Sequence, residues 1–134
     1  MLIALVGCGL FYIYLLAFPG GEAALHANEV KSMKNARNIC LACRQYAREH
    51  GGNYPPSFDT LFPNYMQDRL KLISPLNSAE PVGYTYTPPP VARTDSPDTV
   101  VIEDKFAPTV DHNRIVVYAN GSAQILDSAT PAPQ

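Results

Sequence analysis

The chain has 134 residues, a formal charge of −2 and a pI near 5.8. This length allows one small domain beside one membrane-length segment and argues against a second independent core. The near-neutral charge provides no broad basic surface, which argues against nucleic acid as a partner.

The first 21 residues contain no charged side chain. As a helix, residues 1–18 would be about 27 Å long, close to the roughly 30 Å thickness of bilayer hydrocarbon. A cleavable secretory signal begins with positive charge and ends at a small-x-small site, and both are missing here. We therefore predict an apolar helix over residues 1–21 that spans a membrane and kinks near Pro19 to Gly21.

Residues 22–52 predict an amphipathic helix, because they contain no proline and end in Gly51 and Gly52. Its predicted core-facing stripe follows spacings of three and four: Met33, Ala36, Cys40, Cys43 and Ala47. The solvent-facing side is expected to carry the basic residues Lys34, Arg37, Arg44 and Arg48.

Cys40 and Cys43 form a CxxC motif that lies on the predicted core-facing stripe. No second CxxC accompanies it, and no βαβ pattern surrounds it, so core packing is the favoured interpretation. Redox chemistry and metal binding remain the alternatives. His26 and His50 have no paired nucleophile nearby in the sequence and are interpreted as surface residues.

Residues 53–82 predict an irregular connector that packs on the amphipathic helix. A short helix is expected at Ser57 to Leu61, capped by Ser57 and stopped before Pro63, with a turn near Tyr65 to Leu70. Twelve of the thirteen prolines lie after Tyr54, which indicates a helical first third and a loop-rich remainder.

Residues 83–127 predict a small antiparallel sheet with strands in 83–87, 99–104 and 114–126. Asn120-Gly121 interrupts the last run and predicts a type I′ hairpin turn, in which both central residues have positive φ. The same residues, with Ser122, match a glycosylation sequon, but the hairpin is the simpler explanation. Residues 128–134 are expected to form a frayed tail. The fold class is therefore α+β.

One cluster of candidate metal ligands lies within ten residues: Glu103, Asp104, Asp111 and His112. A solvated inter-strand loop is the favoured interpretation, because the spacing matches no EF-hand or zinc pattern. A structural calcium site and a catalytic role are the alternatives. The chain has no GxSxG, phosphate-loop or HExxH motif, so neither an enzymatic activity nor a cofactor is predicted.

The layout of apolar helix, amphipathic helix, connector and sheet resembles type IV pilins and the pseudopilins of type II secretion. "NARNICLACRQYAREHGGNYPPSFDTLFPNYM" (Asn35 to Met66) is similar to a stretch common in pseudopilin-like proteins. "HNRIVVYANGSAQIL" (His112 to Leu126) is similar to the C-terminal signature of a bacterial subgroup. Family members have a glutamate at the fifth position of the processed chain, where this sequence has Leu5.

The resemblance implies a pilin-like fold and a structural role in a bacterial filament. The subunit would sit in the inner membrane before assembly and then in an extracellular or periplasmic helical homo-polymer, with secretion-system proteins as possible partners. The expected assembly residues are Leu2, Ile3, Ala4, Leu5, Val6, Gly7, Cys8, Gly9, Leu10, Phe11, Ile13, Leu15, Leu16 and Pro19. The alternatives are a non-polymerising single-span membrane protein with a periplasmic binding domain, and an anchored enzyme or metal-binding domain.

Overall fold

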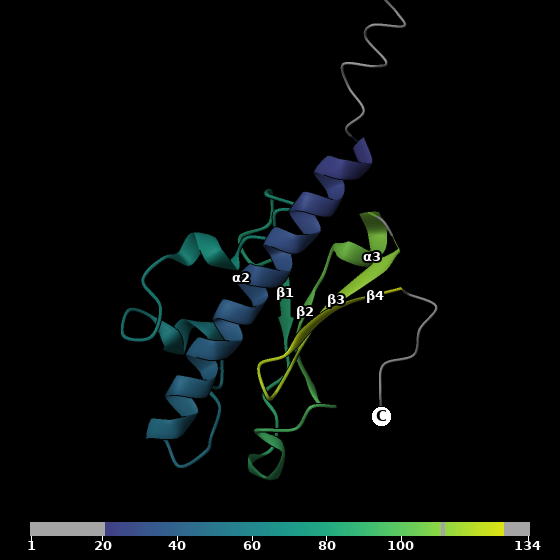
Figure 1. Ribbon diagram of the computed structural model, residues 1–134. Coiled ribbons are helices and arrows are strands. Elements are labelled where there is room, and N and C mark those ends of the chain that lie inside the picture. Colours follow the sequence, from purple (N-terminus) through teal and green to yellow (C-terminus); the bar gives the residue numbers. More distant parts are fainter. Residues whose placement is uncertain (1–20, 111, 128–134) are drawn as a thin grey trace, which may run out of the picture.

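The computed structural model describes residues 21–110 and 112–127. A long helix, α2 (Gly21–Glu49), lies across a four-stranded antiparallel sheet, so the α+β class is confirmed (Figure 1). Most of the apolar helix predicted over residues 1–21, and the tail predicted over 128–134, lie outside the described residues. At the predicted kink near Pro19 to Gly21, only Gly21 is described, and it is helical.

Helix α2 buries the predicted stripe except at Met33, which is half-buried, and it ends as its glycines indicate. Ala36, Ile39, Cys40 and Cys43 are fully buried. The helix stops because Gly51 takes a positive φ of 66°, which glycine adopts without steric cost. The Gly52 N–H then donates to the Ala47 carbonyl at 2.8 Å, a 6→1 bond that satisfies the helix end.

The sheet is a meander in the order β1-β2-β3-β4. Its strands are β1 (Tyr84–Tyr86), β2 (Val100–Asp104), β3 (Asn113–Tyr118) and β4 (Ala123–Asp127). The register shifts between Val100 and Ile102, which pair with Tyr118 and Val117. This irregularity lets both Val101 and Ile102, although adjacent, join the core under α2.

The β3–β4 hairpin is present, but its predicted type I′ turn is wrong. Gly121 has a φ of 89°, whereas Asn120 does not take a positive φ. The Gly121 N–H donates to the Tyr118 carbonyl and the Tyr118 N–H donates to the Ser122 carbonyl. The loop therefore has three residues, a turn followed by one left-handed glycine, a combination that requires only one positive φ.

The connector packs on α2 as predicted, with Phe58, Leu61 and Leu72 buried. It contains two 3₁₀ helices, η1 (Phe58–Leu61) and η2 (Arg69–Leu72). The predicted cap at Ser57 is wrong, because its side chain makes no capping hydrogen bond. Asp68 instead caps η2 by accepting from the Leu70 N–H at 2.9 Å.

Two further short helices interrupt the loops between strands. These are η3 (Val91–Arg93), between β1 and β2, and α3 (Ala107–Val110), between β2 and β3. The solvated loop predicted after β2 is therefore wrong in part, since it holds a helical turn with a fully buried Ala107.

Candidate functional site

The start of α2 extends beyond the sheet and carries few buried residues (Figure 1). From Gly21 to Asn28 every residue is exposed except the half-buried Leu25. Burial begins at Glu29, whose carboxylate accepts from Asn113 Nδ2 at 3.0 Å and lies 3.7 Å from His26 Nδ1. The contact with the folded body therefore starts about two turns after the apolar segment ends.

A buried carboxylate, Asp104, joins α2, the connector and the sheet. Its Oδ2 accepts from the hydroxyls of Ser32 at 2.5 Å and Ser74 at 2.6 Å. Its Oδ1 accepts from the backbone N–H groups of Phe106 at 2.7 Å and Ala107 at 3.0 Å. Four donors satisfy a carboxylate that is only 1% exposed. This role is structural, and it explains why α3 begins where it does.

The proposed metal-ligand cluster does not converge among the described residues. Glu103 and Asp104 are adjacent on β2 and face opposite sides of the sheet. Glu103 instead forms a bidentate ion pair with Arg114, at 2.7 and 2.9 Å. His112 is exposed with a φ of 56°, and Asp111 lies outside the described residues. Within residues 21–110 and 112–127, no group of three potential ligands is assembled.

The CxxC cysteines are packed into the core, as the favoured interpretation predicts. Both thiols are free and fully buried, and Cys40 Sγ donates to the Tyr118 carbonyl at 3.5 Å. Burial raises the pKa of Cys40 to about 11 and raises the pKa of Cys43 further. Neither thiol is therefore a ready thiolate nucleophile near neutral pH. His26 and His50 are exposed as predicted.

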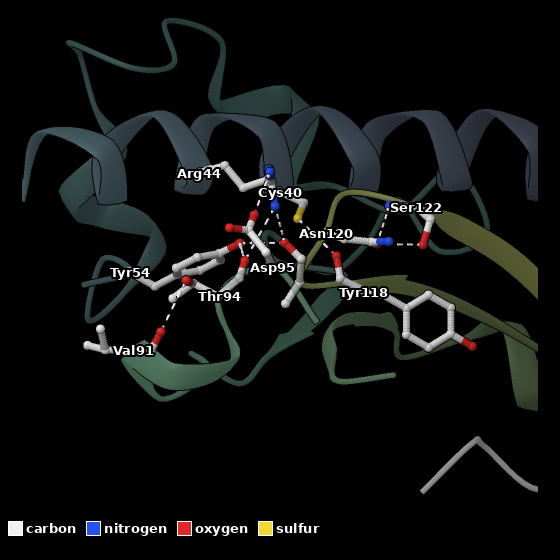
Figure 2. Close-up of polar contacts among 10 residues, drawn as sticks. Cys40, Arg44, Tyr54, Val91, Thr94, Asp95, Tyr118, Asn120 and Ser122 are labelled. Carbon is white, nitrogen blue, oxygen red and sulfur yellow. Dashed lines mark hydrogen bonds and ion pairs between the residues drawn. The ribbon is translucent and has the colours of Figure 1, made fainter. Parts of the chain in front are cut away.

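Arg44 departs from the sequence-based prediction, because it reaches inward from α2 to the loops below it (Figure 2). Its guanidinium donates to the Ala119 carbonyl at 2.5 Å and the Thr94 carbonyl at 3.3 Å. It also pairs with the Asp95 carboxylate at 2.8 Å. The Tyr54 hydroxyl donates to the same two carbonyls, at 2.8 Å and 3.2 Å. Arginine and tyrosine thus hold the β3–β4 turn and the loop before β2 against the end of α2.

A pocket of about 250 Å³ opens beside these contacts. It is lined by Arg44, Ala47, Arg48, Gly52, Tyr54, Thr94 and Asp95. The walls come from the last turns of α2, the segment that follows the helix end, and the loop after η3. Two guanidinium groups and one carboxylate line it, so the pocket carries excess positive charge.

Sequence reasoning missed this pocket because it placed Arg44 with the solvent-facing basic residues. A signal was available, since Arg44 is four residues after Cys40 and three before Ala47, and helical residues at those spacings share a face. The part played by Tyr54 depends on carbonyls in two distant loops. No local pattern indicates that contact.

The predicted assembly residues, Leu2 to Pro19, lie outside the described residues. Within the part of the chain that is described, no helix combines the length and apolar character needed to cross a bilayer. Comparisons of the chain with models of known protein families, with curated proteins and with solved structures found no match.

Proposed function

We propose that this protein is a structural subunit of a pilus-like or pseudopilus-like filament and assembles through its apolar N-terminal segment. The observation that carries the proposal is the junction between that segment and α2. An uncharged run of twenty residues leads directly into a helix whose first two turns project free of the sheet. The exposed first turns of α2 offer surface for contacts with neighbouring copies of the chain.

The driving force in this proposal is burial of apolar side chains between neighbouring segments. A helix that is apolar on all sides is stable in water only where other helices cover it. Gly7, Cys8 and Gly9, with Ala4 one turn away, offer a small-residue face for close approach. Before assembly the same segment would anchor the subunit in the inner membrane. The proposal includes no catalytic residue and no cofactor.

The sheet domain faces outward in this proposal and remains folded throughout assembly. Two features of the described residues support that role: a single core shared by α2, the connector and the sheet, and a buried carboxylate with a full set of donors. In this proposal both features keep the domain folded while its anchor moves from the membrane to the filament.

Electron microscopy of sheared cell-surface material tests the proposal. Cells that express the full chain are expected to release fibres that contain it. The variant Leu10→Lys places a charge in the apolar segment and is expected to remove the chain from fibres, because a buried unpaired charge costs several kcal/mol. Leu70→Lys is the matched control, since Leu70 is 70% exposed, and fibres should persist.

The main alternative predicts a different result in the same experiment. A non-polymerising anchor with a periplasmic binding domain would remain a membrane-bound monomer in the unaltered chain. Recovery of monomer alone, under expression levels at which the protein is abundant in membranes, would contradict the filament proposal.

A further inference from the structure

The pocket at the end of α2 combines a small volume with unbalanced charge. At about 250 Å³ it lies slightly below the usual range for drug-sized ligands, so it suits a molecule of a few heavy atoms. Arg44 and Arg48 are one turn apart on α2, and like charges at this spacing repel each other. Among the residues that line the pocket, only Asp95 carries a negative charge to balance the two arginines.

Arg44 is already held in a geometry that receives an oxyanion. Its Nη1 donates to the Ala119 and Thr94 carbonyls, and its Nη2 donates to Asp95, so three of five N–H donors are used. The side chain is 19% exposed, whereas that of Asp95 is 81% exposed. The Asp95 carboxylate is thus a loosely held anion on a firmly positioned guanidinium.

Arg48 provides the second half of the site. It is exposed, lines the pocket, and has no hydrogen-bond or ion-pair partner among residues 21–110 and 112–127. Guanidinium groups bind carboxylates and phosphates through paired N–H donors, so an anion placed between the two arginines would relieve their repulsion.

We infer that the pocket lined by Arg44, Arg48, Tyr54 and Asp95 binds a small oxyanion, a carboxylate or a phosphate, bridged between the two guanidinium groups. The Asp95 carboxylate oxygen, 2.8 Å from Arg44 Nη2, marks one position at which an anionic oxygen binds this guanidinium. The incoming anion uses the free donors of Arg48 and the remaining donors of Arg44. This inference does not depend on the filament proposal, because α2 and the loops form the pocket within one chain.

Titration of the full chain in uncharged detergent micelles tests the inference. Inorganic phosphate and succinate are added in separate experiments, and sodium chloride at matched ionic strength corrects for general screening. Melting temperature and calorimetric heats are followed. A saturable rise in melting temperature with either anion beyond the chloride effect is expected, because ligand binding to the folded state stabilises it. Comparing the two anions identifies whether a phosphate or a carboxylate is preferred.

Variants of two exposed arginines on α2 locate the site. Arg48→Gln is expected to weaken anion binding at least tenfold and to change the melting temperature without anion only slightly, because the Arg48 side chain has no hydrogen-bond or ion-pair partner among the described residues. Arg37→Gln, whose residue is exposed and does not line the pocket, should bind as the unaltered chain does. Responses to phosphate and succinate equal to chloride, or equal losses in the two variants, would overturn the inference.

Discussion

Asp104 shows how a single side chain in this fold joins segments far apart in the sequence. Its donors come from α2, from the connector and from the backbone that begins α3. Tyr84 extends the network, because its hydroxyl lies 3.1 Å from the Ser32 hydroxyl. The contact between α2, the connector and the sheet therefore depends on the Asp104 carboxylate as a shared acceptor.

Asp104→Ala is expected to lower the free energy of unfolding by at least about 3 kcal/mol, because it leaves several buried donors without an acceptor. Urea unfolding followed by circular dichroism measures the effect. Asp98→Ala is the matched control, because Asp98 is exposed and its carboxylate has no partner within the described residues. The control should change stability by less than about 0.5 kcal/mol. Equal effects would contradict the proposed role of Asp104.

Gly83 is a second residue whose identity is constrained, because Ser74 packs so closely against it that no space remains for a side chain. A Cβ at this position would lie 2.4 Å from Ser74 Cβ and 2.5 Å from the Ser74 backbone nitrogen. Gly83→Ala is expected to destabilise the fold by about 1–3 kcal/mol, because the backbone itself must move.

Gly21→Ala is the control for this substitution. Among the described residues, a Cβ at Gly21 meets nothing within 4 Å, and the residue is helical, so stability should hold or rise by up to about 1 kcal/mol. Thermal unfolding of the two variants side by side gives the comparison. A tolerated Gly83→Ala would show that the approach of Ser74 is not a constraint.

At the scale of elements, the end of α2 is attached to the sheet by polar contacts as well as by apolar packing. Arg44 and Tyr54 donate to the same pair of carbonyls, Thr94 and Ala119, from two sides. Among the described residues, no backbone N–H donates to either of these two loop carbonyls. The side chains of Arg44 and Tyr54 thus provide the hydrogen bonds that satisfy these two carbonyls.

Arg44→Met is expected to lower the free energy of unfolding by about 1–3 kcal/mol, because it removes hydrogen bonds from partly buried carbonyls while keeping the apolar stem. Amide hydrogen exchange in the β3–β4 turn should accelerate as well. Arg37→Met removes the same charge from an exposed position and should leave both quantities nearly unchanged. Unchanged exchange in Arg44→Met would contradict the attachment.

At the scale of the whole molecule, several buried acids hold their protons more tightly than in the unfolded chain. Burial raises the pKa of Cys40 from 9.0 to about 11 and that of Tyr84 from 10.0 to about 12. The folded state therefore retains protons that the unfolded state has released above pH 9. The stabilising contribution is complete below that pH and falls as the pH rises toward 11 and 12.

Urea unfolding at intervals from pH 7 to 11 is expected to show a plateau followed by a decline. The slope should not exceed about 1.4 kcal/mol per pH unit for each proton involved. Cys40→Ala removes one of these groups and should make the decline shallower, whatever the substitution does to stability at pH 7. A decline of the same slope in both proteins would contradict the role of Cys40.

Sequence reasoning predicted the fold class, the buried stripe of α2, its glycine stop and the antiparallel strands. These features depend on local periodicity and on the conformational freedom of glycine. It misjudged Arg44, because the partners of this side chain lie in loops that are distant in sequence. It also misjudged the Asn120 turn, where Asn-Gly fits both a two-residue and a three-residue hairpin loop, and the cap at Ser57. The pocket could not be predicted, since its wall requires the packed positions of the end of α2, the segment after it and the loop after η3.

Two of the polar contacts that hold α2 against the rest of the fold are made by Ser32 and Arg44. Twelve residues separate them, about 18 Å along the helix axis. One contact alone would let the helix pivot about that point, whereas two contacts at this distance oppose such a pivot. A pull on the N-terminal end of α2 is therefore transmitted to the sheet as shear along the helix, shared between a buried carboxylate and a pair of loop carbonyls. Both contacts lie on the C-terminal side of the exposed turns from Gly21 to Asn28, so a load applied to those turns acts on α2 as on the arm of a lever.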